Sequence, residues 1–97
     1  MYLPIICTLS GAELQARREG VLRAAAATLL ETKPLADGFA YRFPSGSLKQ
    51  LAELVELESA CCRFFTFKLI VEPADGPVWL EVTGPPGAKE FLSTLFA

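Results

Sequence analysis

Three side chains near the middle of the chain carry its most concentrated reactive chemistry. Cys61 and Cys62 are adjacent, Glu58 precedes them by one helical turn, and the aromatic run at residues 64–67 follows. Residues three and four positions apart on a helix are neighbours, so Glu58 is expected beside both thiols. Soft cations such as zinc, cadmium, mercury and copper(I) prefer thiolate ligands. The pattern predicts a thiolate-rich metal or metalloid site with Cys61, Cys62 and Glu58 as ligands and Cys7 as the candidate third sulfur.

Glu58 is the unusual member of this group. Residues 48–63 read as a helix, and a step of about 100° per residue places Glu58 near the middle of its apolar face. That face is formed by Leu48, Leu51, Leu54, Val55, Cys61, Cys62 and Phe65. Burying an unpaired carboxylate costs several kcal/mol unless it is hydrogen-bonded, neutralised or bound to a cation. We therefore expect Glu58 to need a partner, whereas Glu53 and Glu56 point toward solvent.

Two interpretations without a metal remain open. Free cysteine is often buried as a small hydrophobe, so both thiols could simply pack beneath the aromatic run. Adjacent helical positions also diverge by about 100°, which suits a shared ion badly unless the helix ends between them. Cys7, three residues before Ser10 at a helix start, instead resembles a one-thiol redox site. Packed thiols predict a dimerisation or small-ligand-binding module with structural cysteines. A reactive Cys7 predicts a thiol-redox protein.

Length and composition limit the partners of the chain. Its 97 residues are enough for one domain, 1–97, which buries roughly two-thirds of its unfolded surface. The composition is 52% hydrophobic and only 21% charged, so part of the apolar surplus is expected to cover a second copy in a homodimer or a small apolar ligand. A net charge of −2 argues against nucleic acid as a partner, since such domains usually carry clustered Lys and Arg.

The residue types also bear on where the protein is located and on whether it is an enzyme. The N-terminus lacks the basic residues of a signal peptide, and no apolar run approaches the ~20 residues that span a bilayer. We expect no membrane partner and a cytoplasmic location, where thiols stay reduced. The three cysteines, an odd number, favour a thiol or metal role over a disulfide framework. Because the chain has no histidine and no nucleophile–base pair, we expect a binding protein rather than an enzyme.

Hydrophobic periodicity predicts eight elements around these residues. They are a strand at 3–7, a helix from 10 to somewhere in 24–27, strands at 28–33 and 39–43, the helix at 48–63, strands at 65–72 and 78–83, and a short helix from 88. Capping-box spacing marks both long helices, through Ser10 with Glu13 and Ser47 with Gln50. An α+β fold follows, with an antiparallel sheet covered by helices on one face.

The first six elements resemble a ferredoxin-like split βαβ core, to which a further strand and a C-terminal helix are added. In that topology Cys7 lies at the opposite end of the molecule from Cys61 and Cys62, because the 48–63 helix runs antiparallel to the first strand and is ~24 Å long. A different topology that brings the strand end to the helix end would allow a three-thiol site. Arg17 and Arg18 are expected on a solvated helix face. Trp79 is expected to cap the sheet or to meet another subunit.

Four stretches together resemble a known group of proteins. They are Cys7-Thr8-Leu9-Ser10, Asp37-Gly38-Phe39, the segment 57–67 with its Glu-x-x-Cys-Cys-x-Phe core, and the segment 80–85. The group consists of small bacterial proteins that occur alone or as a module following MerR-type, metal-responsive regulators. The resemblance implies an association with heavy-metal or other stress responses, without an assigned reaction or metal. The regulators' winged helix-turn-helix and coiled coil are missing here, so it implies an effector-type module standing alone.

Overall fold

A computed structural model describes residues 11–93, except for the side chain of Leu14. Its elements are α1 (Ala12–Thr28), β1 (Glu31–Leu35), β2 (Gly38–Phe43), α2 (Leu48–Cys61), β3 (Thr66–Val71), β4 (Val78–Thr83) and α3 (Ala88–Leu92). The predicted α+β class with an antiparallel sheet is confirmed. The strand predicted at residues 3–7 lies outside the described residues, and the ferredoxin-like order is not confirmed.

The sheet is built from two hairpins that lie side by side. Its strand order is β1-β2-β4-β3, and every neighbouring pair is antiparallel. The β1–β2 hairpin turns at residues 36–37, and β4 lies between β2 and β3. Gly38 permits the close approach of β2 to β4, because a Cβ at this position would lie 1.9 Å from the Val82 carbonyl oxygen. The register of the sheet therefore depends on a residue without a side chain at position 38.

The two faces of the sheet differ in character. Alternate residues of β2 and β4, such as Tyr41, Phe43, Leu80 and Val82, point toward the helices and are buried. Residues of the opposite parity, such as Arg42, Trp79 and Glu81, are only half-buried and form the other face. That second face carries the side chains of Glu31, Lys33, Arg42, Trp79 and Glu81, among others.

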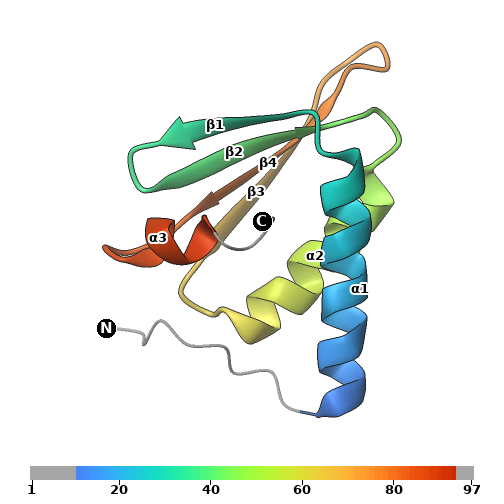
Figure 1. The fold of residues 1–97 in the computed structure, drawn as a ribbon. Coiled ribbons are helices and arrows are strands. Elements are labelled where there is room, and N and C mark those ends of the chain that lie inside the picture. Colours follow the sequence, from blue (N-terminus) through green and yellow to red (C-terminus); the bar gives the residue numbers. More distant parts are fainter. Residues whose placement is uncertain (1–10, 94–97) are drawn as a thin grey trace.

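The helices close the core on one side of the sheet, as predicted. Helix α1 packs along α2, α2 contacts β3, and α3 contacts β2 (Figure 1). The core combines leucines of α2, the aromatic side chains after it, and Ala88 and Leu92 of α3. Leu48, predicted on the apolar face of α2, is instead 42% exposed because it lies in the first turn, beyond the packed part of the helix.

Several predicted boundaries were wrong by a few residues. Helix α1 continues through the alanine run to Thr28, so β1 begins at Glu31 rather than at 28. Alanine is the best helix former, and the Thr28 hydroxyl donates a hydrogen bond to the Ala25 carbonyl at 3.0 Å. Ser47 is the N-capping residue of α2, as predicted, but its side chain makes no capping hydrogen bond. The N-capping residue of α1 is Gly11, and Ser10, the predicted cap, lies outside the described residues.

Candidate functional site

The end of α2 positions the two adjacent cysteines. The helix ends at Cys61, and Cys62 leaves it with φ −114° and ψ 80° while its N–H still donates to the Glu58 carbonyl at 2.6 Å. The 100° divergence of a regular helix therefore does not apply, and the two Sγ atoms lie 3.7 Å apart. The condition under which adjacent cysteines could share an ion, a helix that ends between them, is met.

An apolar shell surrounds both sulfurs. Cys61 and Cys62 are fully buried, and they belong to the same core cluster as Phe64 and Phe65. The rings of Phe64 and Phe65 are 4.4 Å apart, and Phe64 also meets Phe91 edge-on. Because these rings exclude water, charges near the sulfurs interact more strongly than they would at the surface.

Glu58 pairs with Arg18, an arginine that was predicted to be solvated. It is only 1% exposed, and Arg18 of α1 contacts it twice: Nη2 donates to Oε2 at 3.2 Å, and Nε lies 2.5 Å from Oε1. Arg18 is itself only 19% exposed, so its predicted place on a solvated face was wrong. The physical reason is that α1 packs along α2, which brings the two opposite charges together in a region of low dielectric.

A signal for this pair was present in the sequence. Arg18 precedes Leu22 by four residues and Ala25 by seven, so it belongs to the buried stripe of α1. Glu58 occupies the buried stripe of α2. One charge of opposite sign on each apolar stripe indicates a pair across the helix interface. Arg17, in contrast, is exposed as predicted and pairs with Glu53 at 3.0 Å.

The Cys62 thiol is held in its protonated form. Its Sγ lies 3.8 Å from Glu58 Oε2 and is placed to donate to it. Burial, and to a smaller extent the negative charge of Glu58, raise the pKa of Cys62 from 9.0 to about 11, while Arg18 opposes the shift. A thiol with this pKa is a poor nucleophile at neutral pH, so Cys62 does not fit the role of an activated catalytic cysteine.

The oxidation state of Cys61 differs from the expectation of reduced thiols. Cys61 is disulfide-bonded in this structure, and Cys62 is a free, buried thiol. A disulfide requires two Cβ atoms within about 4 Å, a tertiary condition that cysteine spacing alone does not reveal. Cys7, predicted as a third ligand, lies outside the described residues. Among residues 11–93, no group of three or more cysteine or carboxylate side chains is arranged to hold a metal ion.

Comparisons with known proteins identify no relative. The chain matches no protein-family model, no curated protein and no solved structure. Within the part of the chain that the structure describes, no helix has the length and apolar character needed to cross a membrane.

Proposed function

We propose that the reduced protein binds a soft divalent metal ion, such as zinc or cadmium, through the thiolates of Cys61 and Cys62. The observation that carries this proposal is the 3.7 Å separation of the two sulfur atoms at the end of α2. Reduction of the Cys61 disulfide is a precondition, because a disulfide sulfur is not a thiolate ligand.

The sulfur separation favours a bent over a linear arrangement. At a metal–sulfur distance of about 2.3 Å, two ligands at a tetrahedral angle are about 3.8 Å apart, whereas two ligands on a line are about 4.6 Å apart. The separation of 3.7 Å corresponds to the first case. Zinc and cadmium therefore suit the pair better than two-coordinate mercury or copper(I), which the residue types alone had left equally open.

The charge balance also favours a divalent ion. Glu58 and Arg18 already neutralise each other beside the thiols. The two thiols would lose two protons on binding. A divalent ion supplies two positive charges in their place, so the net charge of the buried site stays zero. Glu58 was predicted as a metal ligand, but both of its oxygens face Arg18. We therefore assign Glu58 to neutralising Arg18 rather than to binding the metal. The remaining coordination positions fall to water or to Cys7.

Titration of freshly reduced protein with Cd²⁺ under anaerobic conditions tests the proposal. We expect a thiolate-to-cadmium absorbance band that saturates at one ion per chain and is lost in both Cys61→Ser and Cys62→Ser. Because each thiol releases a proton, the apparent affinity should rise by up to about tenfold per thiol for each pH unit below the thiol pKa. Cys7→Ser reports separately whether the third thiol contributes.

Matched controls distinguish ligation from a general loss of structure. Ser59→Ala, on the exposed side of the same helical turn, should leave the titration unchanged. Circular dichroism of each cysteine variant should match the reduced wild type. A wild-type titration without the band, or a band that survives in both cysteine variants, would overturn the proposal.

A second candidate, a thiol-redox protein, is favoured by one observation: Cys61 is oxidised while the Cys62 sulfur lies 3.7 Å away as a free thiol. Two electrons and two protons from an external dithiol would convert the Cys61 disulfide to two thiols, and the dithiol would become the disulfide. Rapid, repeated reduction by thioredoxin-class dithiols without metal uptake would favour this candidate. Metal uptake with slow reduction would favour the first.

Finer expectations from the sequence belong to the same proposal. They are an effector-type module similar to those following MerR-type regulators, a cytoplasmic location, a homodimer, and a ferredoxin-like core completed by a strand at residues 3–7. The alternative of a dimerisation or small-ligand-binding module also predicts a homodimer, but in it the thiols are buried and unreactive. Native mass spectrometry of the reduced protein, with and without Cd²⁺, measures subunit number and metal stoichiometry together.

A further inference from the structure

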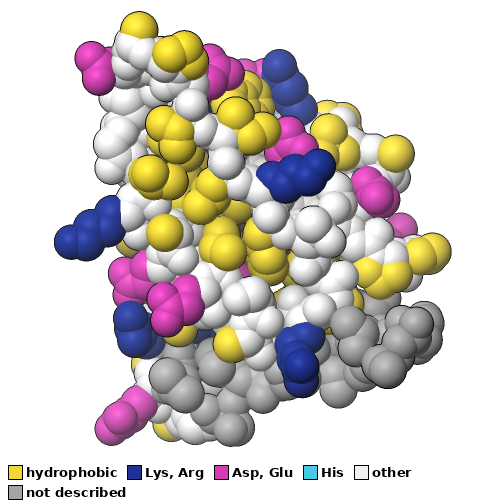
Figure 2. Space-filling model, turned by 180° about the vertical axis from the view of Figure 1, so that it is seen from behind, with side chains coloured by type: hydrophobic (Ala, Val, Ile, Leu, Met, Phe, Trp, Pro, Cys, Tyr) yellow, Lys and Arg dark blue, Asp and Glu magenta, His cyan; other side chains and the backbone are white. Residues whose placement is uncertain are grey.

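A second feature with potential for binding lies on the face of the sheet that the helices do not cover. Cross-strand neighbours place Glu31, Arg42, Trp79 and Ile70 in one row, and Lys33, Ala40, Glu81 and Lys68 in the next. The face turned away from the viewer in Figure 1 carries clustered hydrophobic side chains with basic and acidic side chains among them (Figure 2). This composition differs from the mainly polar surface that the solvated face of an antiparallel sheet usually presents.

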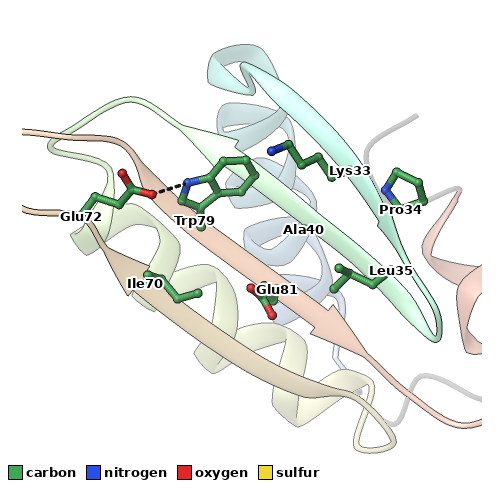
Figure 3. Close-up of a pocket in the computed structure, with 8 residues that line it drawn as sticks. All are labelled: Lys33, Pro34, Leu35, Ala40, Ile70, Glu72, Trp79 and Glu81. Carbon is green, nitrogen blue, oxygen red and sulfur yellow. Dashed lines mark hydrogen bonds between the residues drawn. The ribbon is translucent and has the colours of Figure 1, made fainter.

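A hollow of about 340 Å³ opens between these rows. The small side chain of Ala40 leaves room at its floor, and Trp79, Ile70 and Leu35 form apolar walls. Figure 3 shows these side chains on the side of the sheet opposite the helices, with Lys33 beside the indole and the carboxylate of Glu81 between Leu35 and Ile70. The size lies at the lower end of the range for small-molecule sites.

The polar groups in the hollow favour a cation. Trp79 Nε1 donates to Glu72 at 3.1 Å, which fixes the indole ring, and the Lys33 ammonium lies 5.0 Å from the ring centroid. The ring face therefore already accepts a positive charge. Within residues 11–93, the Glu81 side chain makes no hydrogen bond or ion pair, although Lys68 is its cross-strand neighbour. One carboxylate is thus left to attract a ligand charge.

We propose that this hollow is a binding site for an organic cation, an alkylated ammonium group attached to an apolar body. Its positive centre lies between the Trp79 ring and the Glu81 carboxylate, and its apolar part contacts Ile70 and Leu35. Lys33 occupies the ring face in the absence of the ligand and must move aside. An anion is disfavoured because the lining contains two carboxylates and one ammonium. A neutral aromatic compound would leave Glu81 without a partner.

Fluorescence titration tests this proposal, because Trp79 is the only tryptophan of the chain. Benzyltrimethylammonium is the probe, with benzyl alcohol and benzoate as neutral and anionic analogues. We expect a saturable change with the ammonium and at least about fivefold weaker responses with both analogues, as a cation–π contact of ordinary strength implies. Lys33→Met, which keeps the apolar stem and removes the competing charge, should tighten binding.

The variant Glu81→Gln keeps the shape of the side chain and should weaken binding by about fivefold, because it removes one exposed ion pair. Glu56→Gln, an exposed carboxylate on α2, is its matched control and should bind like the wild type. Calorimetric titration of Trp79→Ala replaces the lost fluorescence signal and should show no binding. Equal binding by Glu81→Gln and the wild type, a stronger response to benzoate, or a change that never saturates would overturn the proposal. Cys62→Ser should bind the probe normally, which keeps this site separate from the thiols.

Discussion

At the scale of single residues, the decisive contact is the ion pair between Arg18 and Glu58. It joins α1 to α2 and lies against the Cys62 thiol. A buried charge with a partner is tolerated, whereas the same charge without one destabilises the fold by several kcal/mol. The carboxylate that first suggested a bound cation is therefore neutralised within the chain, and the case for a metal depends on the sulfur atoms.

Removing Arg18 should expose the cost of the unpaired carboxylate. We expect Arg18→Met to lower the free energy of unfolding by about 3 to 5 kcal/mol, because Glu58 stays buried without its partner. The double variant with Glu58→Met should recover most of this loss, since it buries no charge. Urea denaturation of the reduced proteins measures both. Arg17→Met, which breaks only the exposed pair with Glu53, should cost under about 1 kcal/mol. Equal losses in the two arginine variants would contradict this account.

The Cys62 thiol should make stability depend on alkaline pH. Its pKa is raised from 9.0 to about 11 in the folded protein, so between these values the unfolded chain binds fewer protons than the native one. Stability is then fully present below pH 9 and falls as the pH rises toward 11, by at most roughly 2 to 3 kcal/mol.

Urea denaturation across this range, without a reductant so that Cys61 keeps its disulfide, measures the effect. Cys62→Ala should flatten the decline. The pKa of Tyr41 is raised by burial to about 12, so Tyr41→Phe is introduced into both proteins to remove its titration. An unchanged slope in Cys62→Ala would show that the thiol does not contribute.

At the scale of elements, the exact ends of α2 and β2 matter most. Helix α2 stops between the two cysteines and so brings their sulfurs together. Strand β2 begins at Gly38, where its backbone lies against the Val82 carbonyl of β4. Both features arise from backbone geometry at a single position rather than from the type of the element.

The glycine at the start of β2 should be far less replaceable than one on α1. In Gly38→Ala the new Cβ would lie 1.9 Å from a carbonyl oxygen, so the strands must separate, and we expect a loss of roughly 2 to 4 kcal/mol. In Gly20→Ala the Cβ meets no atom within 4 Å, and the change should stabilise α1 by about 0.5 to 1 kcal/mol. Thermal and urea denaturation measure both variants. A tolerated Gly38→Ala would show that the β2–β4 contact adapts easily.

At the scale of the whole molecule, the sheet separates two chemically distinct regions. The cysteines and the ion pair lie in the layer between helices and sheet, and the hollow around Trp79 lies on the uncovered face. A ligand that binds in either region of the folded chain more tightly than it binds the unfolded chain should stabilise the whole protein by mass action.

Cadmium should therefore raise the stability of the reduced protein. At a free concentration one hundred times the dissociation constant, the free energy of unfolding should increase by about 2.7 kcal/mol. The increase should vanish in Cys62→Ser, and Mg²⁺, which prefers oxygen ligands, should have no effect on the wild type. Urea denaturation with each ion provides the measurement. A similar gain in Cys62→Ser would place the metal elsewhere.

By itself, the sequence determined the α+β class and the place of Glu58 on the buried face of a helix, because both follow from local periodicity of apolar residues. Only the tertiary structure decided what accompanies Glu58, since Arg18 lies forty positions away and becomes its partner when α1 packs along α2. The separation of the Cys61 and Cys62 sulfurs likewise depended on where α2 ends. Local pattern specifies which side chains turn inward, whereas long-range packing specifies which of them meet.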